Sequence, residues 1–322
     1  MSVLIYTENW DGKFKKVSYE LASYATKLAA EMGVTVSAIS LGPVEESELA
    51  KLGNYGITSV MSAPCSNYTS LDNQAIATAV AAAAKKVGAT VVILAQSNLG
   101  KAIAPRLSVK LNAGFVSGVQ GLPVSLQPFT VKKMVFTGKA FAKTTIHTAI
   151  KVITLAPNSF GIVESPVQST IEKFDGGLSD ADFTTKIEST NKVTGKVLLT
   201  DADIVVSAGR GMKAAENWGP IEELAGLLGA GLACSRPVSD EGWRSHGEHV
   251  GQTGKIIAPN LYFAFGISGA IQHLGGVSSS KCIVAINKDK DAPIFEAADY
   301  GIVGDVFKVL PQLIEAVKEN KS

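Results

Sequence analysis

The sequence predicts an α/β protein with two Rossmann-like domains that have mainly parallel sheets, the first carrying appended antiparallel strands. Strand-like apolar runs alternate with amphipathic helical stretches through the first half of the chain, and the alternation returns near Asp203. The 322 residues are enough for two cores of ordinary size. A βαβα order of this kind implies parallel strands with helices on both faces of the sheet.

The first block shows this order most clearly. SVLIYTE and VTVSAISLG are predicted strands on either side of a helix that ends at Gly33. DNQAIATAVAAAAKKVG is an alanine-rich helix, which Asp72 caps and Gly88 stops. TVVILAQ is a continuous apolar run, typical of a strand that is buried on both faces.

The pattern changes from about Phe115 to Ile187, where short runs rich in Thr and Val alternate with polar residues. TVKKMVFTGKAFAKTTI and AIKVITLAP are predicted antiparallel strands, with a turn at Gly138 and Lys139. FDGGLSDADFTTKIESTNKVTGK is polar, and its end is the predicted link between domains. The predicted domains are therefore residues 1–192 and 193–322.

In the second block, DIVVSAGRG, LYFAFGISG and KCIVAIN are predicted strands with their turns, and GPIEELAGLLGAG, AIQHLGG and VFKVLPQLIEAVKEN are predicted helices. The stretches VVILAQ…LNAGFVS and IVVSAG…LGAGLACS form a faint repeat. This repeat reflects either an internal duplication or the common pattern of α/β units.

Composition excludes several classes of protein. With 46% apolar and 18% charged residues the chain is not a disordered protein, and its net charge of +1 gives no argument for binding nucleic acid. No run of about 18 apolar residues predicts a membrane span. Strand residues begin at Val3, which leaves no room for a targeting peptide. The three cysteines show no metal spacing and fit a reducing compartment, so we expect a cytoplasmic bacterial protein without direct membrane insertion.

Ligands of open parallel sheets bind beyond the C-terminal ends of the strands, so the loops after the strands of the second block are the candidate sites. VVSAGRGMKA matches a loose G-x-G-x-x-A pattern through Gly209, Gly211 and Ala214. The acidic residue of a dinucleotide site is missing about 20 residues further on. Glycines after a strand more often just make the turn.

FGISGAIQHL is the stronger candidate. Gly266, Ser268 and Gly269 lie between a strand and a helix start, where backbone N–H groups can approach an anion such as pyrophosphate. Ser268 can instead cap the helix, and His273 can be a core histidine that bonds a backbone carbonyl. Gln272 favours a polar pocket, because two adjacent large polar side chains point to different faces of the helix and both need partners.

The third candidate is LACSRPVSDEGWRSHGEHVGQTGK. Its two histidines and Glu248 lack a clear further ligand, so no metal site is predicted. Arg236, Gln252 and Thr253 are donors that suit a planar, carbonyl-rich ligand. The alternative is a solvated loop.

Several motifs of the second block together resemble the alpha subunit of electron transfer flavoprotein. They are VGQTGK, LYFAFGISGAIQH, VAINKD followed by APIF, and ADYGIVGD followed by VFKVLP, in the order and spacing of that family. SAGRG and CSRP upstream are similar to the same family. The resemblance is close from about Ile204 to Pro311 and looser over the first domain.

The resemblance implies that residues 193–322 form an FAD-binding domain and that residues 1–192 form a scaffold facing a partner. The implied partner is a beta subunit that carries AMP or a second FAD. The implied role is that of an electron carrier, not an enzyme, with no catalytic residues. Its electrons would come from acyl-CoA or other flavin dehydrogenases and pass to a membrane quinone oxidoreductase, in a process such as fatty acid beta-oxidation.

Three alternatives stay open. A flavin-based bifurcating variant of the family would share these motifs. A non-redox nucleotide-binding module would need the phosphate loops but not Arg236, Thr253 and His273 together. A pyridine-nucleotide oxidoreductase would need a fuller glycine motif and an acidic ribose ligand.

The resemblance also implies how the isoalloxazine ring is held. Arg236 would lie beside it, and Thr253 would bond flavin N5 with Gln252 close by. His273 would face the C2 carbonyl, with Gln272 nearby. A histidine and an arginine at this edge would favour the one-electron anionic form, as an oxyanion hole favours a developing charge. The helix dipole lowers the pKa of a histidine and a flavin anion raises it, so His273 is a hypothetical redox-coupled proton site.

The rest of the cofactor follows the same motifs. Ser235 and Ser268 would lie at the pyrophosphate, while Asn287 and Asp305 would hold the adenosine part. In chain order the implied cofactor-binding residues are Arg210, Ser235, Arg236, Gln252, Thr253, Gly266, Ile267, Ser268, Gly269, Ala270, Gln272, His273, Asn287 and Asp305. Pro237 departs from some members of the family, and the resemblance assigns no role to Trp243, His246 or His249.

Overall fold

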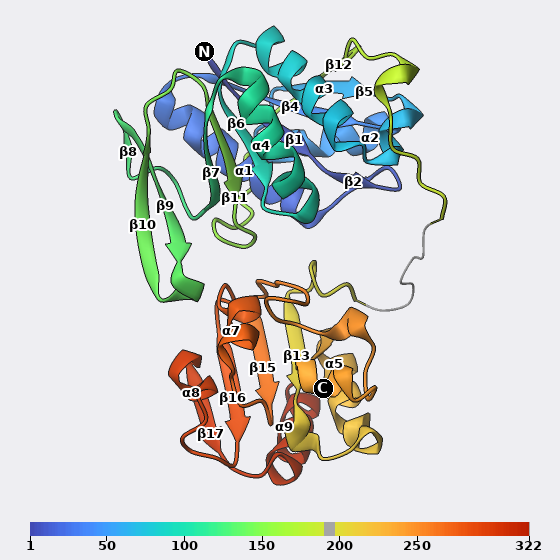
Figure 1. Cartoon of the computed structure of the whole chain (residues 1–322), viewed down its shortest axis with the longest axis vertical. Helices are drawn as coiled ribbons and strands as arrows, with labels where there is room; N and C mark the ends of the chain where they lie inside the picture. Colours follow the sequence, from blue (N-terminus) through green and yellow to red (C-terminus); the bar gives the residue numbers. More distant parts are fainter. Residues whose placement is uncertain (190–196, 322) are drawn as a thin grey trace. The chain divides into compact units, whose positions relative to one another are not determined.

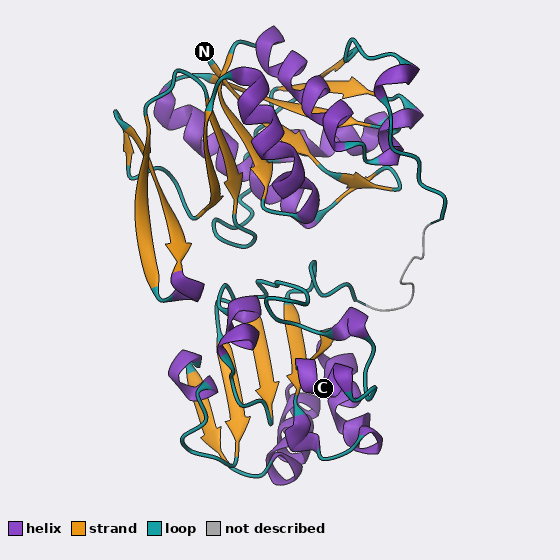
Figure 2. Ribbon diagram, in the orientation of Figure 1, coloured by secondary structure: helices purple, strands orange, loops and turns teal. Residues whose placement is uncertain are grey.

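A computed structural model describes residues 1–189 and 197–321 of the chain. The chain forms two compact units, one over Met1–Val135 and Lys139–Thr190 and the other over Phe136–Gly138 and Asn191–Ser322. Each unit has its own sheet and its own core (Figures 1 and 2). The predicted domain boundary after residue 192 lies outside the described residues.

The first unit contains a mainly parallel sheet. Its strand order is β10-β9-β7-β11-β6-β1-β4-β5-β12, and β8 pairs with β9 off this path. In that order the strands are Ala140–Ile146, Phe129–Val135, Gly114–Val119, Lys151–Leu155, Ala89–Ala95, Ser2–Thr7, Thr35–Leu41, Ser59–Ala63 and Thr170–Lys173, with β8 at Ser125–Leu126. A small hairpin, β2 (Asn9–Trp10) with β3 (Lys13–Phe14), follows β1.

Helices cover both faces of this sheet (Figure 2). Val3 and Ile5 of β1 pack with α1 in one core, while Leu4 and Tyr6 face α3 and α4 in the other. The helices are α1 (Lys16–Met32), α2 (Glu46–Leu49), α3 (Asn73–Lys86) and α4 (Asn98–Leu111). Gly33 ends α1 in the left-handed conformation, with φ 65°, as predicted.

The prediction for the middle of the chain is right for one pair of strands and wrong for a third strand. β9 and β10 are antiparallel and join the edge of the sheet. AIKVITLAP instead supplies β11, which runs parallel to both β6 and β7 inside the sheet. Its Val152 and Ile153 are fully buried on opposite faces, and burial on both faces is typical of a central parallel strand.

Asp72 anchors the polar segment that leaves the first unit. One carboxylate oxygen accepts the N–H groups of Gln74 and Ala75 and caps α3 as predicted. The other accepts from the Thr184 amide and hydroxyl and from the Thr185 amide. The hydrogen bond from Ala75, joined by those from Thr184 and Thr185, holds the pKa of Asp72 well below its ordinary value. This segment therefore stays on the first unit up to at least Thr185.

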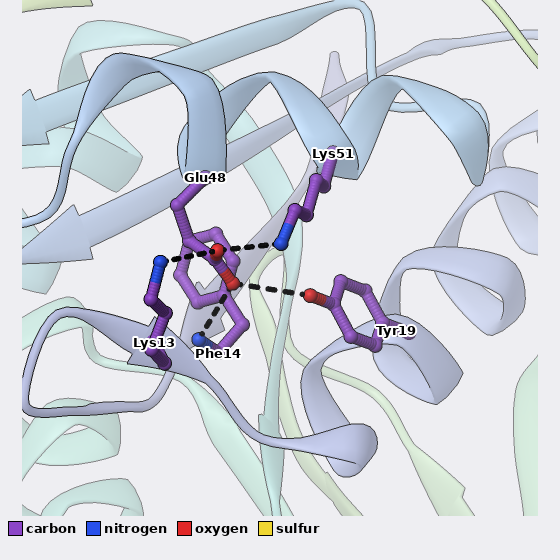
Figure 3. Close-up of polar contacts among 5 residues, drawn as sticks. All are labelled: Lys13, Phe14, Tyr19, Glu48 and Lys51. Carbon is purple, nitrogen blue, oxygen red and sulfur yellow. Dashed lines mark hydrogen bonds and ion pairs between the residues drawn. The ribbon is translucent and has the colours of Figure 1, made fainter.

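A second buried carboxylate, Glu48, joins three elements of the first unit (Figure 3). It accepts hydrogen bonds from the Phe14 amide, the Tyr19 hydroxyl and the ammonium groups of Lys13 and Lys51, the last at 2.7 Å. Burial alone would raise the pKa of Glu48. The donors outweigh that effect and lower the pKa to about 2 from 4.5. Glu48 thus ties the β2–β3 hairpin and α1 to α2.

Glu48→Gln is expected to lower the free energy of unfolding by about 1–3 kcal/mol near neutral pH, because a charged acceptor with four donors is lost. The folded-state pKa is depressed, so this stabilisation is present above about pH 4.5 and is lost as the pH falls toward 2. Urea unfolding of both proteins across this range checks the sign: the difference should shrink on acidification. Exposed Glu45→Gln is the control and should change little. An E48Q difference that grows at low pH would contradict this account.

The second unit contains a parallel sheet with the order β14-β13-β15-β16-β17. In that order the strands are Gly231–Cys234, Ile204–Ala208, Leu261–Phe265, Ile283–Asn287 and Tyr300–Val303. The helices are α5 (Gly219–Leu228), α6 (Arg236–Asp240), α7 (Ile271–Val277), α8 (Ile294–Ala297) and α9 (Val306–Lys321). The predicted fold class, two Rossmann-like units with mainly parallel sheets, is confirmed.

Alternate residues of β15 serve the two faces of this sheet. Phe263 and Phe265 pack with α5 and α9, whereas Tyr262 and Ala264 point to the face that carries α7 and α8. Across residues 1–189 and 197–321, no helix combines the length and the apolar character that a membrane span requires.

Candidate cofactor site

The strand order of the second unit places a crevice between β13 and β15. From β13 the chain moves outward to β14 and then returns to β15 on the opposite side of β13. The loops after β13 and β15 therefore diverge at a topological switch point, where open α/β sheets bind their ligands. These loops begin at Gly209 and Gly266.

The two loops touch through their backbones. Gly211 donates its N–H to the Gly266 carbonyl at 3.1 Å, and a Cβ on Gly211 would lie only 2.6 Å from the Gly266 Cα. A Cβ on Gly209 would meet the same carbonyl oxygen at 2.4 Å. Short 3-10 turns, not a long helix, follow these glycines. The glycines thus serve close packing of the two loops, and the dinucleotide-turn interpretation of G-x-G-x-x-A is wrong in its geometry.

A cavity of about 930 Å³ opens at these loops. It brings together twelve of the fourteen residues predicted for the site: Arg210, Ser235, Arg236, Thr253, Gly266, Ile267, Ser268, Ala270, Gln272, His273, Asn287 and Asp305. These residues come from the ends of the five strands of one sheet and from the segments that follow them.

Gln252 and Gly269 are not part of the cavity wall. The Gln252 side chain lies over Gly275, where a Cβ would meet its Cγ at 2.6 Å, and its backbone N–H donates to the Gln272 carbonyl. Gly269 has φ 84° and faces the start of α8, because a Cβ there would lie 2.3 Å from the Ile294 nitrogen. Both residues shape the loops around the cavity.

Arg236 begins α6 and is held by two neighbours at the cavity. Its Nε donates to Asp240 at 3.2 Å and its NH1 to the Thr253 hydroxyl at 3.3 Å. Pro237 occupies the first turn of α6, where a missing N–H costs nothing. Pro237, which departs from some members of the family, is therefore compatible with the α6 backbone. The Arg236 guanidinium leaves the Thr253 hydroxyl proton available to donate elsewhere.

His273 is buried on α7 and carries no charge at neutral pH. Its Nε2 lies 2.8 Å from the Tyr262 hydroxyl, whereas Nδ1 is buried and makes no hydrogen bond within residues 1–189 and 197–321. Burial lowers the pKa of His273 to about 4, against a smaller opposite effect of the Val250 carbonyl. His273 is thus bonded to a tyrosine, and the Val250 carbonyl, the kind of partner that the core-histidine alternative expects, also acts on its ring.

The opposite wall of the cavity is organised by short side chains. Asn287 donates to the Ile267 carbonyl at 2.9 Å and accepts from the Asp289 amide at 3.0 Å. Asp305 accepts from the Phe307 amide and so caps α9. Each side chain fixes one loop of the wall.

Sequence reasoning missed several residues of the wall. The missed residues with polar side chains are Lys213, Asp240, His249, Lys288 and Asp289. Three of them adjoin predicted positions, since Lys288 and Asp289 follow Asn287 and Lys213 follows the Arg210 turn. His249 is buried, and burial, with the nearby Arg236, lowers its pKa. A bridge between Cys234 of β14 and His249 places this histidine at the cavity. Such a tertiary pairing cannot be recognised from the local sequence pattern.

An ion-pair cluster around the largely buried Arg244 side chain includes Glu248, the residue before His249. Arg244 bonds Glu248 at 2.6 Å and Glu222 at 2.5 Å, and its guanidinium lies 5.1 Å from the Trp218 ring. His246 bonds the Ser239 hydroxyl at 2.8 Å. Throughout the described residues, 1–189 and 197–321, no three His, Cys, Asp or Glu side chains are grouped in a way that could hold a metal ion.

The donor set fits a long, flat, anionic cofactor. Four cationic side chains face the cavity, namely Arg210, Lys213, Arg236 and Lys288. Gly266, Ser268 and Ala270 line the cavity at the switch point, and the buried Nδ1 of His273 makes no hydrogen bond within the described residues. A volume of about 930 Å³ is large for a small substrate and suits a dinucleotide.

Fold and site together define a nucleotide-cofactor protein of the α/β class. Residues 198–278 match the electron transfer flavoprotein FAD-binding domain, and residues 3–176 match the electron transfer flavoprotein domain. The chain belongs to the family of electron transfer flavoprotein alpha subunits. It is an FAD-dependent electron carrier and not an enzyme with a substrate of its own.

Relatives match over nearly the whole chain. An electron transfer flavoprotein subunit alpha from Thermoanaerobacterium thermosaccharolyticum is 38% identical over 99% of this chain and 98% of its own length. One from Megasphaera elsdenii is 36% identical over 99% of this chain and 97% of its own length. Protein FixB of Clostridium saccharobutylicum is 32% identical over 98% of this chain and 96% of its own length.

Proposed function

We propose that this chain pairs with a beta subunit to form a heterodimeric electron transfer flavoprotein. The heterodimer takes electrons from flavin dehydrogenases, such as acyl-CoA dehydrogenases, and passes them to a membrane quinone oxidoreductase. It works in the bacterial cytoplasm, and residues 193–322 act as its FAD-binding domain. The observation that carries this proposal is the convergence of Arg236, Thr253 and His273 on one cavity.

Bound FAD supplies the redox chemistry, and the residues around it set where charge is favoured. Arg236 contributes a fixed positive charge beside the isoalloxazine ring, preorganised by Asp240. Thr253 accepts from Arg236 and directs its own hydroxyl proton to flavin N5. His273 contributes a neutral ring at the C2 carbonyl edge, because its pKa of about 4 keeps it uncharged.

The remaining predicted residues hold the rest of the cofactor. Ser235 and Ser268 bind the pyrophosphate and ribityl region, where Gly266 also lines the wall, with Arg210 nearby. Asn287 and Asp305 face the adenosine part. Because these two side chains also fix their own loops, their wall exists before FAD binds.

An exposed sheet edge supports the pairing with a beta subunit. All four residues of β17 are exposed, including Tyr300 at 68% and Val303 at 61%. β17 ends the sheet, so one side of its backbone has no strand beside it in the described chain. Exposed apolar residues on an edge strand are typical of a surface that a partner covers.

The test is flavin analysis of the full chain co-expressed with its beta subunit. We expect one FAD at this site per heterodimer. Arg236→Ala should weaken FAD binding about 10–100-fold, because a charge-assisted contact contributes about 1.5–3 kcal/mol. Arg106→Ala, at an exposed position of α4, is the matched control. A second flavin per heterodimer would favour the bifurcating variant, and a heterodimer that takes up no FAD would refute the proposal.

A further inference from the structure

Tyr262 is the side chain that holds the His273 ring. The Tyr262 hydroxyl lies 2.8 Å from Nε2, and both side chains are buried. The ring centroids are 6.1 Å apart and the planes are inclined by 46°, so the contact is a hydrogen bond at the ring edge and not a stack. One nitrogen of His273 is thereby tied to β15.

The tyrosine end of this contact is the rigid one. Tyr262 is fully buried and sits in β15, opposite Val205 of β13 and Ile283 of β16. α7, which carries His273, has 7 residues and no side-chain cap. A short helix without a cap does not fix a ring orientation by itself, whereas a central strand fixes the direction of its side chains.

Counting protons gives the direction of the hydrogen bond. Burial raises the pKa of Tyr262 and lowers that of His273, so the hydroxyl keeps its proton and the imidazole carries one. If Nε2–H were the donor, the Tyr262 proton would need a second acceptor. The Ser207 hydroxyl, the nearby side chain that could accept it, makes no hydrogen bond within the described residues. The arrangement that uses both protons has the Tyr262 O–H donating to Nε2.

We propose that Tyr262 is a positioning residue of the cofactor site, whose hydroxyl donates to Nε2 and fixes the neutral His273 tautomer that carries its proton on Nδ1. This rests on the proposed function, in which His273 contacts the cofactor. Nδ1 is the other buried ring atom, and the Val250 carbonyl also acts on this ring. The cavity wall then presents a neutral imidazole of fixed orientation.

The test is nitrogen-15 NMR of the full chain labelled at histidine, near neutral pH, before and after FAD is added. The chain has only four histidines, so single His→Gln variants assign the signals. In the wild type, His273 should be neutral with its proton on Nδ1. In Tyr262→Phe the preference for Nδ1–H over Nε2–H should fall about fivefold, as expected for loss of one hydrogen bond. Tyr24→Phe is the matched control. It also removes a buried tyrosine hydroxyl, but one that makes no hydrogen bond within the described residues, so it should leave the His273 signal unchanged.

The outcomes separate the two proposals. If His273 of the wild type carries its proton on Nε2, the proposed role of Tyr262 is overturned. This outcome is measured on the wild-type protein and does not depend on the folding of a variant. An unchanged tautomer in Y262F overturns it as well. If Y262F behaves as expected but FAD binds without moving the His273 signals, the positioning role stands and the contact between His273 and the cofactor is refuted.

Discussion

Gly266→Ala is expected to destabilise the second unit by roughly 3 kcal/mol or more and to abolish FAD binding. Gly266 has φ 59°, which disfavours any residue with a Cβ, and a Cβ there would lie 2.7 Å from the Gly211 Cα. Backbone atoms cannot move aside as a flexible side chain can. The loops after β13 and β15 would therefore separate, and the part of the cavity wall that they form would be lost. Thermal unfolding and flavin content of the purified variant measure both effects.

Gly226→Ala is the control for this prediction. Gly226 lies inside α5, and a Cβ there would meet no atom within 4 Å. Alanine should therefore stabilise the chain by about 0.5–1 kcal/mol through its higher helix propensity. If G266A unfolds at the wild-type temperature and keeps its flavin, the close approach of the two loops does not constrain the site.

Arg244→Met is expected to lower the free energy of unfolding by about 3–5 kcal/mol, because removing one member of a buried ion pair leaves the other without its counter-charge. The Arg244 side chain is 14% exposed and that of Glu248 is 9% exposed. Methionine keeps the volume near Trp218 but neutralises neither Glu248 nor Glu222. Urea unfolding of the variant measures the loss.

Lys318→Met tests whether burial is the cause. Lys318 pairs with Glu223 at 2.6 Å, but both side chains are about half exposed. Surface pairs contribute about 0–1 kcal/mol, so this variant should resemble the wild type. Equal losses in R244M and K318M would show that the position of the pair does not matter.

The sequence predicted those parts of the fold whose signals are local. Asp72 caps α3 and Gly33 ends α1 because a cap depends on a few neighbouring residues. The place of β11 depends on β6 and β7, which lie far from it in sequence. α4 escaped prediction because Gly100 and Pro105 interrupt its helical pattern. Gly100 is required there, since a Cβ would lie 1.9 Å from the Ala95 carbonyl oxygen.

The candidate site divides in the same way. Motifs with a fixed order predicted Arg236, Thr253 and His273, and the structure gathers them at one cavity. The partner of His273 was not predicted. Tyr262 lies eleven residues earlier on a strand whose alternation suggests only a core position, and strand-to-helix packing turns its hydroxyl toward the imidazole. Such a pair follows from tertiary packing and cannot be predicted from the local sequence pattern.

The cavity wall comes from one uninterrupted stretch of chain, from Arg210 to Val306. For protein engineering this makes the site a cassette: two cuts in the gene would move the whole wall into a relative. A chimaera made in this way would inherit the electrostatic surroundings of the flavin intact. Differences in redox behaviour between relatives should therefore travel with this segment, whatever scaffold receives it.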